Sequence, residues 1–276
     1  MATTDTTITD PLVTEAYPDR PNYALGVMLG ADDFTDEQTY HRGRLARALQ
    51  VVGGAGTIAG LKVTYVPKTS TQIEELQVAS GIALDGRGRI IEIAAARCID
   101  LQRWWDNAAA PPDTELTAAF KTDHVVADVF VRFVACGRAR QPAFASGPFD
   151  ALDATTYARI RDGAELKLVT RSETTLPTLV DPWASITGAT AADRLAKAKA
   201  AVLDAWDTIS SQPEKALVPG TLDASLDWLL LARISLPAAQ ASAGALPTRT
   251  ATAPTVDNTV RPVVLVPAAL AHIVGP

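Results

Sequence analysis

Residues 22–63 read NYALGVMLGADDFTDEQTYHRGRLARALQVVGGAGTIAGLKV, and residues 76–93 read LQVASGIALDGRGRIIEI. The first stretch predicts an amphipathic helix over residues 33–52, because acidic residues can cap its start and a run of glycines can end it. Side chains at steps of three and four residues share one face of this helix. They are Phe34, Gln38, His41, Leu45, Leu49 and Val52. The stretch is rich in signals of architecture and poor in chemical motifs.

The second stretch predicts a β-hairpin with arms over residues 76–84 and 89–95. Asp85-Gly86 opens the turn, and Asp-Gly is a strong short-range hairpin signal because glycine accepts the positive φ of a tight reversal. The sequence GRGR over residues 86–89 could be a loop for phosphate or nucleic acid, or a solvated turn. No Lys-Ser/Thr pair of a phosphate-binding loop follows it, so we interpret it as a solvated turn.

The alternation of helical periodicity with short apolar runs predicts an α+β protein that is β-dominated. Hairpin-rich sheets should combine with two main amphipathic helices, over residues 33–52 and 191–209. Residues 125–134 alternate too weakly for a half-exposed strand, so we expect a central strand there that is covered on both faces. The expected strands span residues 60–66, 76–84, 89–95, 125–135, 164–169 and 228–236.

The chain divides into four segments by composition. Residues 1–21 form an N-terminal extended arm, and residues 22–176 form a helix-plus-β-hairpin domain. Residues 177–236 add a helix and a strand that complete or extend the core. Residues 237–276 are a linker followed by an apolar docking tail, which can dock onto its own core or onto a partner.

We expect the arm and the tail to make contacts between chains. The arm has too few apolar side chains to order itself, since fixing the backbone of one residue costs roughly 1–2 kcal/mol. Prolines at 262 and 267 exclude a central strand or an unbroken helix in the tail. A homo-oligomer of ring or trimer symmetry is the expected assembly. The residues expected at the interchain contacts are Leu12, Val13, Tyr17, Val263, Leu265, Leu270 and Ile273.

Composition excludes several classes of protein. The chain has 276 residues, of which 47% are hydrophobic, so it can bury a full core. Its net charge of −6 argues against a surface for nucleic acid or anionic membrane. We find no apolar run long enough for a membrane span and no secretion signal, and therefore expect synthesis in the cytoplasm.

Candidate chemical groups are few and scattered. His41 and Glu37 lie one helical turn apart, as metal ligands can, but no third ligand follows at a suitable spacing. His124 with Asp123 and Asp128 could form an acid/base pair, or His124 could simply end a strand. We expect no metal and no cofactor.

Cys98 and Cys136 are the only cysteines, and each lies in an apolar, strand-like segment. We expect buried free thiols, or a disulfide if the two strands are neighbours. Trp104 and Trp105 could form a sugar-binding platform, but adjacent aromatics at the end of an apolar segment are more often half-buried anchors.

Five segments carry a likeness to known proteins. Residues 23–42 follow the pattern YxxGxxLxAxDFxxEQxYHR, residues 60–63 follow GLxV, and residues 81–91 follow GxALDxxGRxI. Residues 124–136 read HVVADVFVRFVAC, and residues 157–168 contain YARIR and ELKL. The set resembles a group of uncharacterised structural proteins encoded beside sheath and baseplate components of phage tail-like contractile injection systems. The resemblance implies a structural role in a large particle and supplies no catalytic residues.

Three functions remain open at this point. The first is a non-enzymatic structural subunit of a phage tail or tail-like particle, at the baseplate or a fibre-attachment point. Its partners would be baseplate, tube, sheath or fibre proteins, and it would join the particle after synthesis. The second is a carbohydrate- or surface-binding fibre module that uses exposed Trp104, Trp105 and Trp183. The third is an enzyme whose site the sequence hides.

Overall fold

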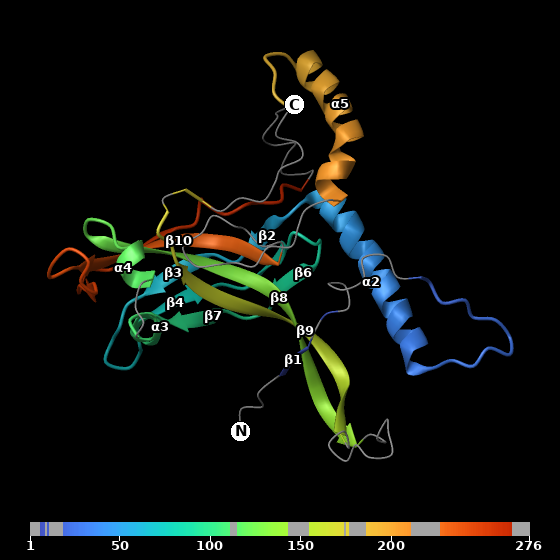
Figure 1. Ribbon diagram of the computed structural model, residues 1–276, viewed down its shortest axis with the longest axis horizontal. Coiled ribbons are helices and arrows are strands. Elements are labelled where there is room, and N and C mark those ends of the chain that lie inside the picture. Colours follow the sequence, from blue (N-terminus) through green and yellow to red (C-terminus); the bar gives the residue numbers. More distant parts are fainter. Residues whose placement is uncertain are drawn as a thin grey trace.

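The structure is a computed structural model of a β-dominated α+β protein. Strands hold 40% of the residues and helices 24%, which confirms the predicted fold class. The structure describes residues 6–8, 10, 19–110, 115–142, 155–173, 175–176, 186–210 and 227–266, with side chains up to residue 203 in the stretch 186–210. In Figure 1 the sheets form one body, and helices α2 (Ala31–Gly53) and α5 (Ala191–Ser210) lie beside it.

The main sheet has six antiparallel strands, and β8 is at its centre. β8 pairs with β9 on one side and with β10 on the other, while β1 extends the β10 side further along β8. Residues 125–131 of β8 are all buried, so the predicted central strand with two covered faces is confirmed. The strands are β1 (Thr6–Ile8), β8 (His124–Pro142), β9 (Thr155–Thr170), β10 (Trp228–Ala239), β11 (Thr248–Arg249) and β12 (Thr255–Asp257).

Two three-stranded sheets pack beside the main sheet. One has the order β2-β5-β6 and the other the order β3-β4-β7. Their strands are β2 (Gly56–Gly60), β3 (Val63–Val66), β4 (Glu75–Val78), β5 (Gly81–Leu84), β6 (Ile90–Ile93) and β7 (Arg97–Asp100). The predicted hairpin is confirmed where β5 pairs with β6, from Gly81↔Ile93 to Leu84↔Ile90.

The predicted strands 60–66 and 76–84 are each broken in two. Gly60 has φ +71° and Leu61 has φ +55°, so the chain bends sharply between β2 and β3. The bend lies against the break between β4 and β5, because the amide of Leu61 donates to Ser80 O at 3.1 Å and the amide of Ala79 donates to Lys62 O at 2.9 Å. One long antiparallel pair is therefore divided at a single point between two sheets.

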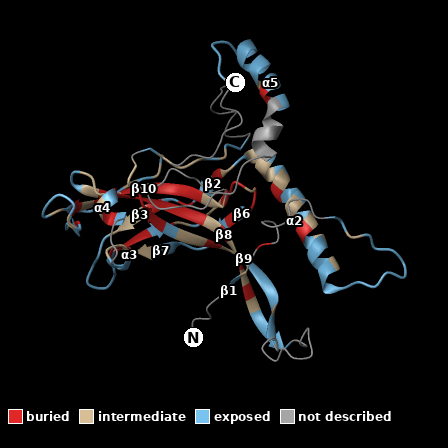
Figure 2. Cartoon of the chain, in the orientation of Figure 1, coloured by how far each residue is buried: buried red, intermediate tan, exposed pale blue. Residues whose placement is uncertain are grey.

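A single apolar core joins the three sheets. It contains the odd-numbered residues of β8 from Val125 to Ala135, together with apolar side chains of β3 to β6 and β10. Two helices that the sequence did not reveal, α3 (Leu101–Ala108) and α4 (Glu115–Ala119), add Leu101, Trp105 and Leu116 to it. Figure 2 shows the buried residues gathered in the sheets, whereas α2 and the part of α5 whose side chains are described carry few of them.

The opposite face of the main sheet covers a buried ionic cluster. Arg233 binds both carboxylate oxygens of Asp128, at 2.8 and 2.9 Å. Arg171 lies 3.3 Å from the same carboxylate and 2.8 Å from Glu173. Asp128 and Arg171 are completely buried, so each stabilises a charge that the interior would otherwise disfavour.

The ends of β8 and β9 leave the body as a two-stranded arm. Pairing between the strands continues out to Pro142↔Thr155, beyond the last residue of β8 that β1 contacts. Residues 139–142 and most of residues 155–162 are exposed (Figure 2). The predicted strands 125–135 and 164–169 are correct in place but shorter than the observed strands, because this arm carries polar side chains.

Candidate functional site

The long helix α2 leaves most of its surface in solvent. It begins after Gly30, whose amide donates to Asp33 Oδ2 at 2.7 Å, and it ends at Gly53. Thr39 and Ala46 are its only buried residues. The helix confirms the predicted range 33–52, yet it covers almost none of the core.

The face of α2 singled out by the sequence pattern is exposed. Phe34 is 50% exposed, Leu45 is 55% exposed and Val52 is 89% exposed. Gln38 and His41 are also exposed, while Leu49 is half-buried. A surface helix normally turns such a stripe toward its own core, so this stripe lacks the cover that its pattern indicates.

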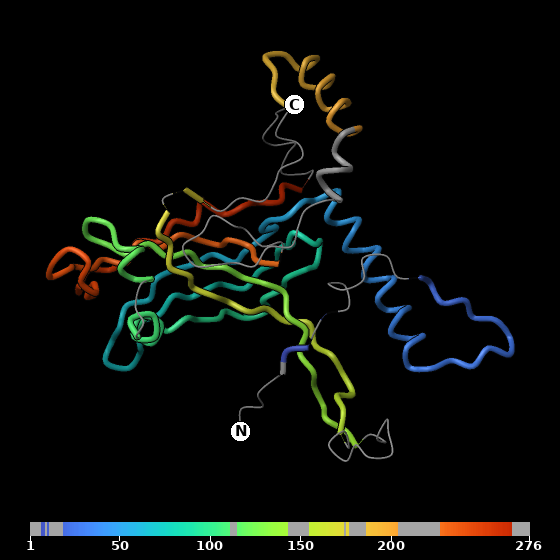
Figure 3. The backbone as a smooth tube through the Cα atoms, in the orientation of Figure 1, coloured from blue at the N-terminus to red at the C-terminus, as the bar shows by residue number. Residues whose placement is uncertain are grey.

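The loop before α2 adds further exposed apolar side chains. Leu25 and Met28 are almost fully exposed, and Val27 is 55% exposed. Figure 3 shows this loop running out past the start of α2, away from the sheets. The Tyr23 hydroxyl donates to Glu37 Oε2 at 2.5 Å, which fastens the loop to the helix.

Helix α5 is a second helix with little cover. Thr190 caps it, because its hydroxyl oxygen accepts a hydrogen bond from the amide of Asp193 at 3.1 Å. Leu195, Val202 and Leu203 are 57%, 62% and 81% exposed. Ala201 is its only buried residue among those whose side chains are described.

The β5–β6 turn holds α2 against the body. Gly88 has φ +79°, and a Cβ at this position would lie 1.9 Å from Ala46 O of the helix. Gln50 Nε2 donates to Gly86 O at 2.8 Å. The glycines of the GRGR segment thus form the turn and also let its backbone contact α2 closely. No sequence signal reveals this contact with α2.

An ionic cluster surrounds the same turn. Arg89 is 6% exposed and binds Asp85, Asp10 and Asp227. Arg87 binds Asp227 at 2.8 Å. The expectation of a solvated turn is therefore wrong, because these arginines neutralise carboxylates that are brought from three parts of the chain.

Asp85 is the most deeply placed carboxylate of this cluster. It is completely buried, and burial raises its pKa to about 6 against the opposing effect of Arg89. The amides of Arg87 and Arg89 donate to its Oδ1 at 2.9 Å each. All its oxygens are occupied in closing the turn, so the cluster has a structural role.

The N-terminal arm contacts its own chain where the structure describes it. Residues 6–8 pair with residues 135–137 of β8. Asp10 is 5% exposed and lies 3.2 Å from Arg42 of α2. Leu12, Val13 and Tyr17 lie outside the described residues, so their interchain contacts stay a prediction.

The described part of the C-terminal tail docks onto β2. The amide of Thr57 donates to Pro262 O and the amide of Val264 donates to Thr57 O, both at 2.9 Å. Val263 and Leu265 remain 55% and 44% exposed. The backbone of residues 262–264 is used within the chain, while the side chains of Val263 and Leu265 stay open to a neighbour. The other predicted tail contacts, Leu270 and Ile273, lie outside the described residues.

The two described histidines, His41 and His124, each lie beside one carboxylate. His41 is exposed and lies 4.0 Å from Glu37. His124 Nδ1 lies 2.7 Å from Asp123 Oδ1, whereas Asp128 pairs with Arg171 and Arg233. Within the described ranges, no three His, Cys, Asp or Glu side chains gather as metal ligands would.

Cys98 and Cys136 are both free thiols. Cys98 is exposed, so the expected burial of this thiol is wrong. It lies on edge strand β7, where a hydrogen bond with Glu75 raises the pKa of the thiol.

The adjacent tryptophans Trp104 and Trp105 are anchors in the body of the protein. Trp105 is 5% exposed, and Trp104 donates to Leu168 O at 2.9 Å. They therefore do not form an exposed pair for a glycan contact.

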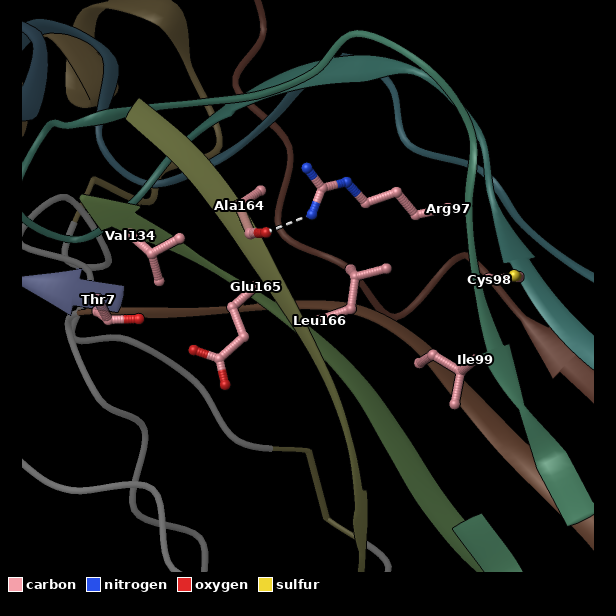
Figure 4. A pocket seen from close by; sticks show the side chains of 8 residues that line it. All are labelled: Thr7, Arg97, Cys98, Ile99, Val134, Ala164, Glu165 and Leu166. Atoms are coloured by element: carbon pink, nitrogen blue, oxygen red, sulfur yellow. Dashed lines mark hydrogen bonds between the residues drawn. The ribbon is translucent and has the colours of Figure 1, made fainter. Parts of the chain in front are cut away.

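A hollow of about 380 Å³ lies between β7 and β9 (Figure 4). Arg97 crosses it and donates to Ala164 O at 2.7 Å. Glu165 is engaged by Arg132 at 2.6 Å. The residues that line the hollow are Thr7, Arg97, Cys98, Ile99, Val134, Ala164, Glu165 and Leu166. Both charged groups are occupied, so the hollow presents no assembled catalytic set.

The sequence matches no protein-family model, and no curated protein is significantly similar to it. In the described part of the chain, no helix combines the length and apolar character that a membrane crossing requires.

The exposed apolar side chains described above mark the candidate functional site, which is the surface of α2, its preceding loop and α5.

Proposed function

We propose that the chain is a non-enzymatic structural subunit of a phage tail or tail-like contractile injection particle, at the baseplate or a fibre-attachment point. The observation that carries the proposal is the apolar surface left open on α2 and α5. The resemblance of residues 23–42 and 81–91 to structural proteins of such systems points in the same direction.

The exposed apolar side chains support an assembled state. Leu25, Met28 and Val52, in α2 and its preceding loop, are almost fully exposed, and Leu203 of α5 is 81% exposed. Large exposed apolar patches mark interaction sites in soluble proteins.

The free edge of β9 is a second surface suited to assembly. Among the described strands, β9 pairs only with β8. Side chains of Arg97 and Trp104 cap its outward carbonyls at Ala164 and Leu168. This edge makes no ladder with another described strand, and a free edge of this kind can accept one.

The ionic clusters fit a structural role. The charges around Asp85 and Asp128 are buried and paired, so they fix the positions of the turn, α2 and the main sheet. The particle partners we propose are baseplate, tube, sheath or fibre proteins together with further copies of this chain. The protein would be made in the cytoplasm and then become part of the particle. Trp183, the remaining candidate for a glycan contact, lies outside the described residues.

Particle membership can be tested directly. Contractile particles are sedimented from lysed source cells through a density gradient, and their subunits are identified by mass spectrometry. We expect the chain in the fractions that hold sheath and tube proteins, at a fixed ratio to them. The chain expressed alone should stay near the top of the gradient. Intact particles that lack the chain would overturn the proposal.

A further inference from the structure

With Ala48 in place of the half-buried Leu49, the exposed stripe of α2 follows a heptad pattern. Its positions are separated by alternating steps of four and three residues, which is the spacing of a coiled-coil seam. They are Phe34, Gln38, His41, Leu45, Ala48 and Val52, and all six are exposed. The seam runs from Phe34 to Val52 within α2, so it is about 27 Å long.

The charges of α2 divide along its length. The first two turns carry Asp32, Asp33, Asp36 and Glu37, and the second half carries Arg42, Arg44 and Arg47. A parallel pair of such helices would set acidic turns beside acidic turns. An antiparallel pair sets the acidic half of each helix beside the basic half of the other. The charge distribution is therefore self-complementary only in the antiparallel orientation.

We propose that α2 pairs antiparallel with α2 of a second copy of this chain through this stripe. In the register that the pattern favours, Phe34 of one copy faces Leu45 of the other, and Gln38 faces His41. This surface goes beyond the proposed particle role, because the pairing requires no other subunit.

The flanking residues support the same register. Glu37 and Arg44 occupy equivalent positions beside the seam, one heptad apart, and in an antiparallel pair Glu37 of each copy lies beside Arg44 of the other. Arg44 is exposed and makes no hydrogen bond or ion pair with any residue that the structure describes. Arg42, on the other flank, is already bound to Asp10. Arg44 is thus available for a partner.

The side of α2 that holds the helix to the body stays clear of this seam. Thr39 and Ala46 are its buried residues, and they point away from the stripe. Val52, near the end of the helix, would face the second copy's exposed segment 27–29, which precedes its helix. The pairing can therefore form without moving α2 from the β5–β6 turn.

The first test is the oligomeric state of the purified full chain, measured by sedimentation equilibrium. We expect a reversible dimer. Leu45→Asp should raise its dissociation constant by roughly a hundredfold or more, because the seam loses two leucines per dimer. Ile73→Asp is the matched control, since Ile73 is 53% exposed on the body. A monomeric wild-type chain, or equal effects of the two substitutions, would overturn the proposal.

The second test reads the orientation. Arg44→Glu and Glu37→Arg should each weaken the dimer roughly tenfold, and the double exchange should restore most of its affinity. In a background with Cys98→Ser and Cys136→Ser, a mixture of Phe34→Cys and Leu45→Cys chains should form a disulfide-linked dimer. Leu45→Cys alone should not. Crosslinking of Leu45→Cys with itself, or failure of the double exchange to restore affinity, would overturn the antiparallel arrangement.

Discussion

Replacing Gly88 with alanine should loosen α2 from the body. The new Cβ would lie 1.9 Å from Ala46 O and 2.8 Å from the amide nitrogen of Gln50, both in the backbone of α2. An L-residue at φ +79° costs roughly 1–2 kcal/mol. Overpacking adds roughly 1–3 kcal/mol. We therefore expect the free energy of unfolding to fall by roughly 2–5 kcal/mol.

Gly244 provides a matched control for this substitution. Its φ is +80°, but no atom lies within 4 Å of the position of an added Cβ. Gly244→Ala should therefore show the backbone strain alone, roughly 1–2 kcal/mol. The measurements are urea denaturation and hydrogen exchange of the α2 amides. Equal losses for the two variants, with unchanged exchange in α2, would refute the close approach of the turn to the helix.

Three further outcomes follow from the ionic clusters and the arm. Burial raises the pKa of Asp85 to about 6, so its protonated form favours the folded state below pH 4, and this contribution is lost as pH rises to 6. The stability of wild type relative to Asp85→Asn should fall by up to roughly 3 kcal/mol over that range in urea titrations; a constant difference would contradict it. Asp128→Ala removes the buried carboxylate that Arg171 and Arg233 share and should cost roughly 3–5 kcal/mol in the same assay. Glu165→Ala, which breaks a half-exposed pair with Arg132, should cost less than about 1 kcal/mol, and similar losses for both would refute the distinction. Replacing Leu12, Val13 and Tyr17 of the N-terminal arm with serine should leave thermal stability unchanged but remove the chain from sedimented particles. Normal incorporation would exclude the N-terminal arm as a tether.

Local signals gave the elements that depend on local chemistry. The Asp-Gly turn at residue 85 predicted the β5–β6 hairpin, and the periodicity of residues 33–52 predicted α2 to within two residues at its start and one at its end. The break at residue 60 was not predictable, because Leu61 takes a positive φ to bury its side chain completely in the core. Only the tertiary structure makes that backbone conformation favourable for a leucine.

Exposure was harder to predict than secondary structure. Cys98 lies in an apolar segment, yet β7 is an edge strand and the thiol faces outward. The apolar pattern of α2 shows which side chains share a face, but it does not show what covers that face. Phe34 and Leu45 look like core residues in the sequence and lie in solvent in the single chain.

The exposed stripe of α2 and the close contact of α2 with the β5–β6 turn are connected. A helix that leaves its apolar stripe exposed gains little from its own core, so it needs other contacts to keep its position. Gly88 packs against the backbone of α2, and the side chain of Gln50 donates to Gly86 O. Arg42 of α2 pairs with Asp10, which Arg89 also binds. None of these contacts uses a residue of the stripe. The chain thus holds α2 by one face, and the other face stays available for a partner.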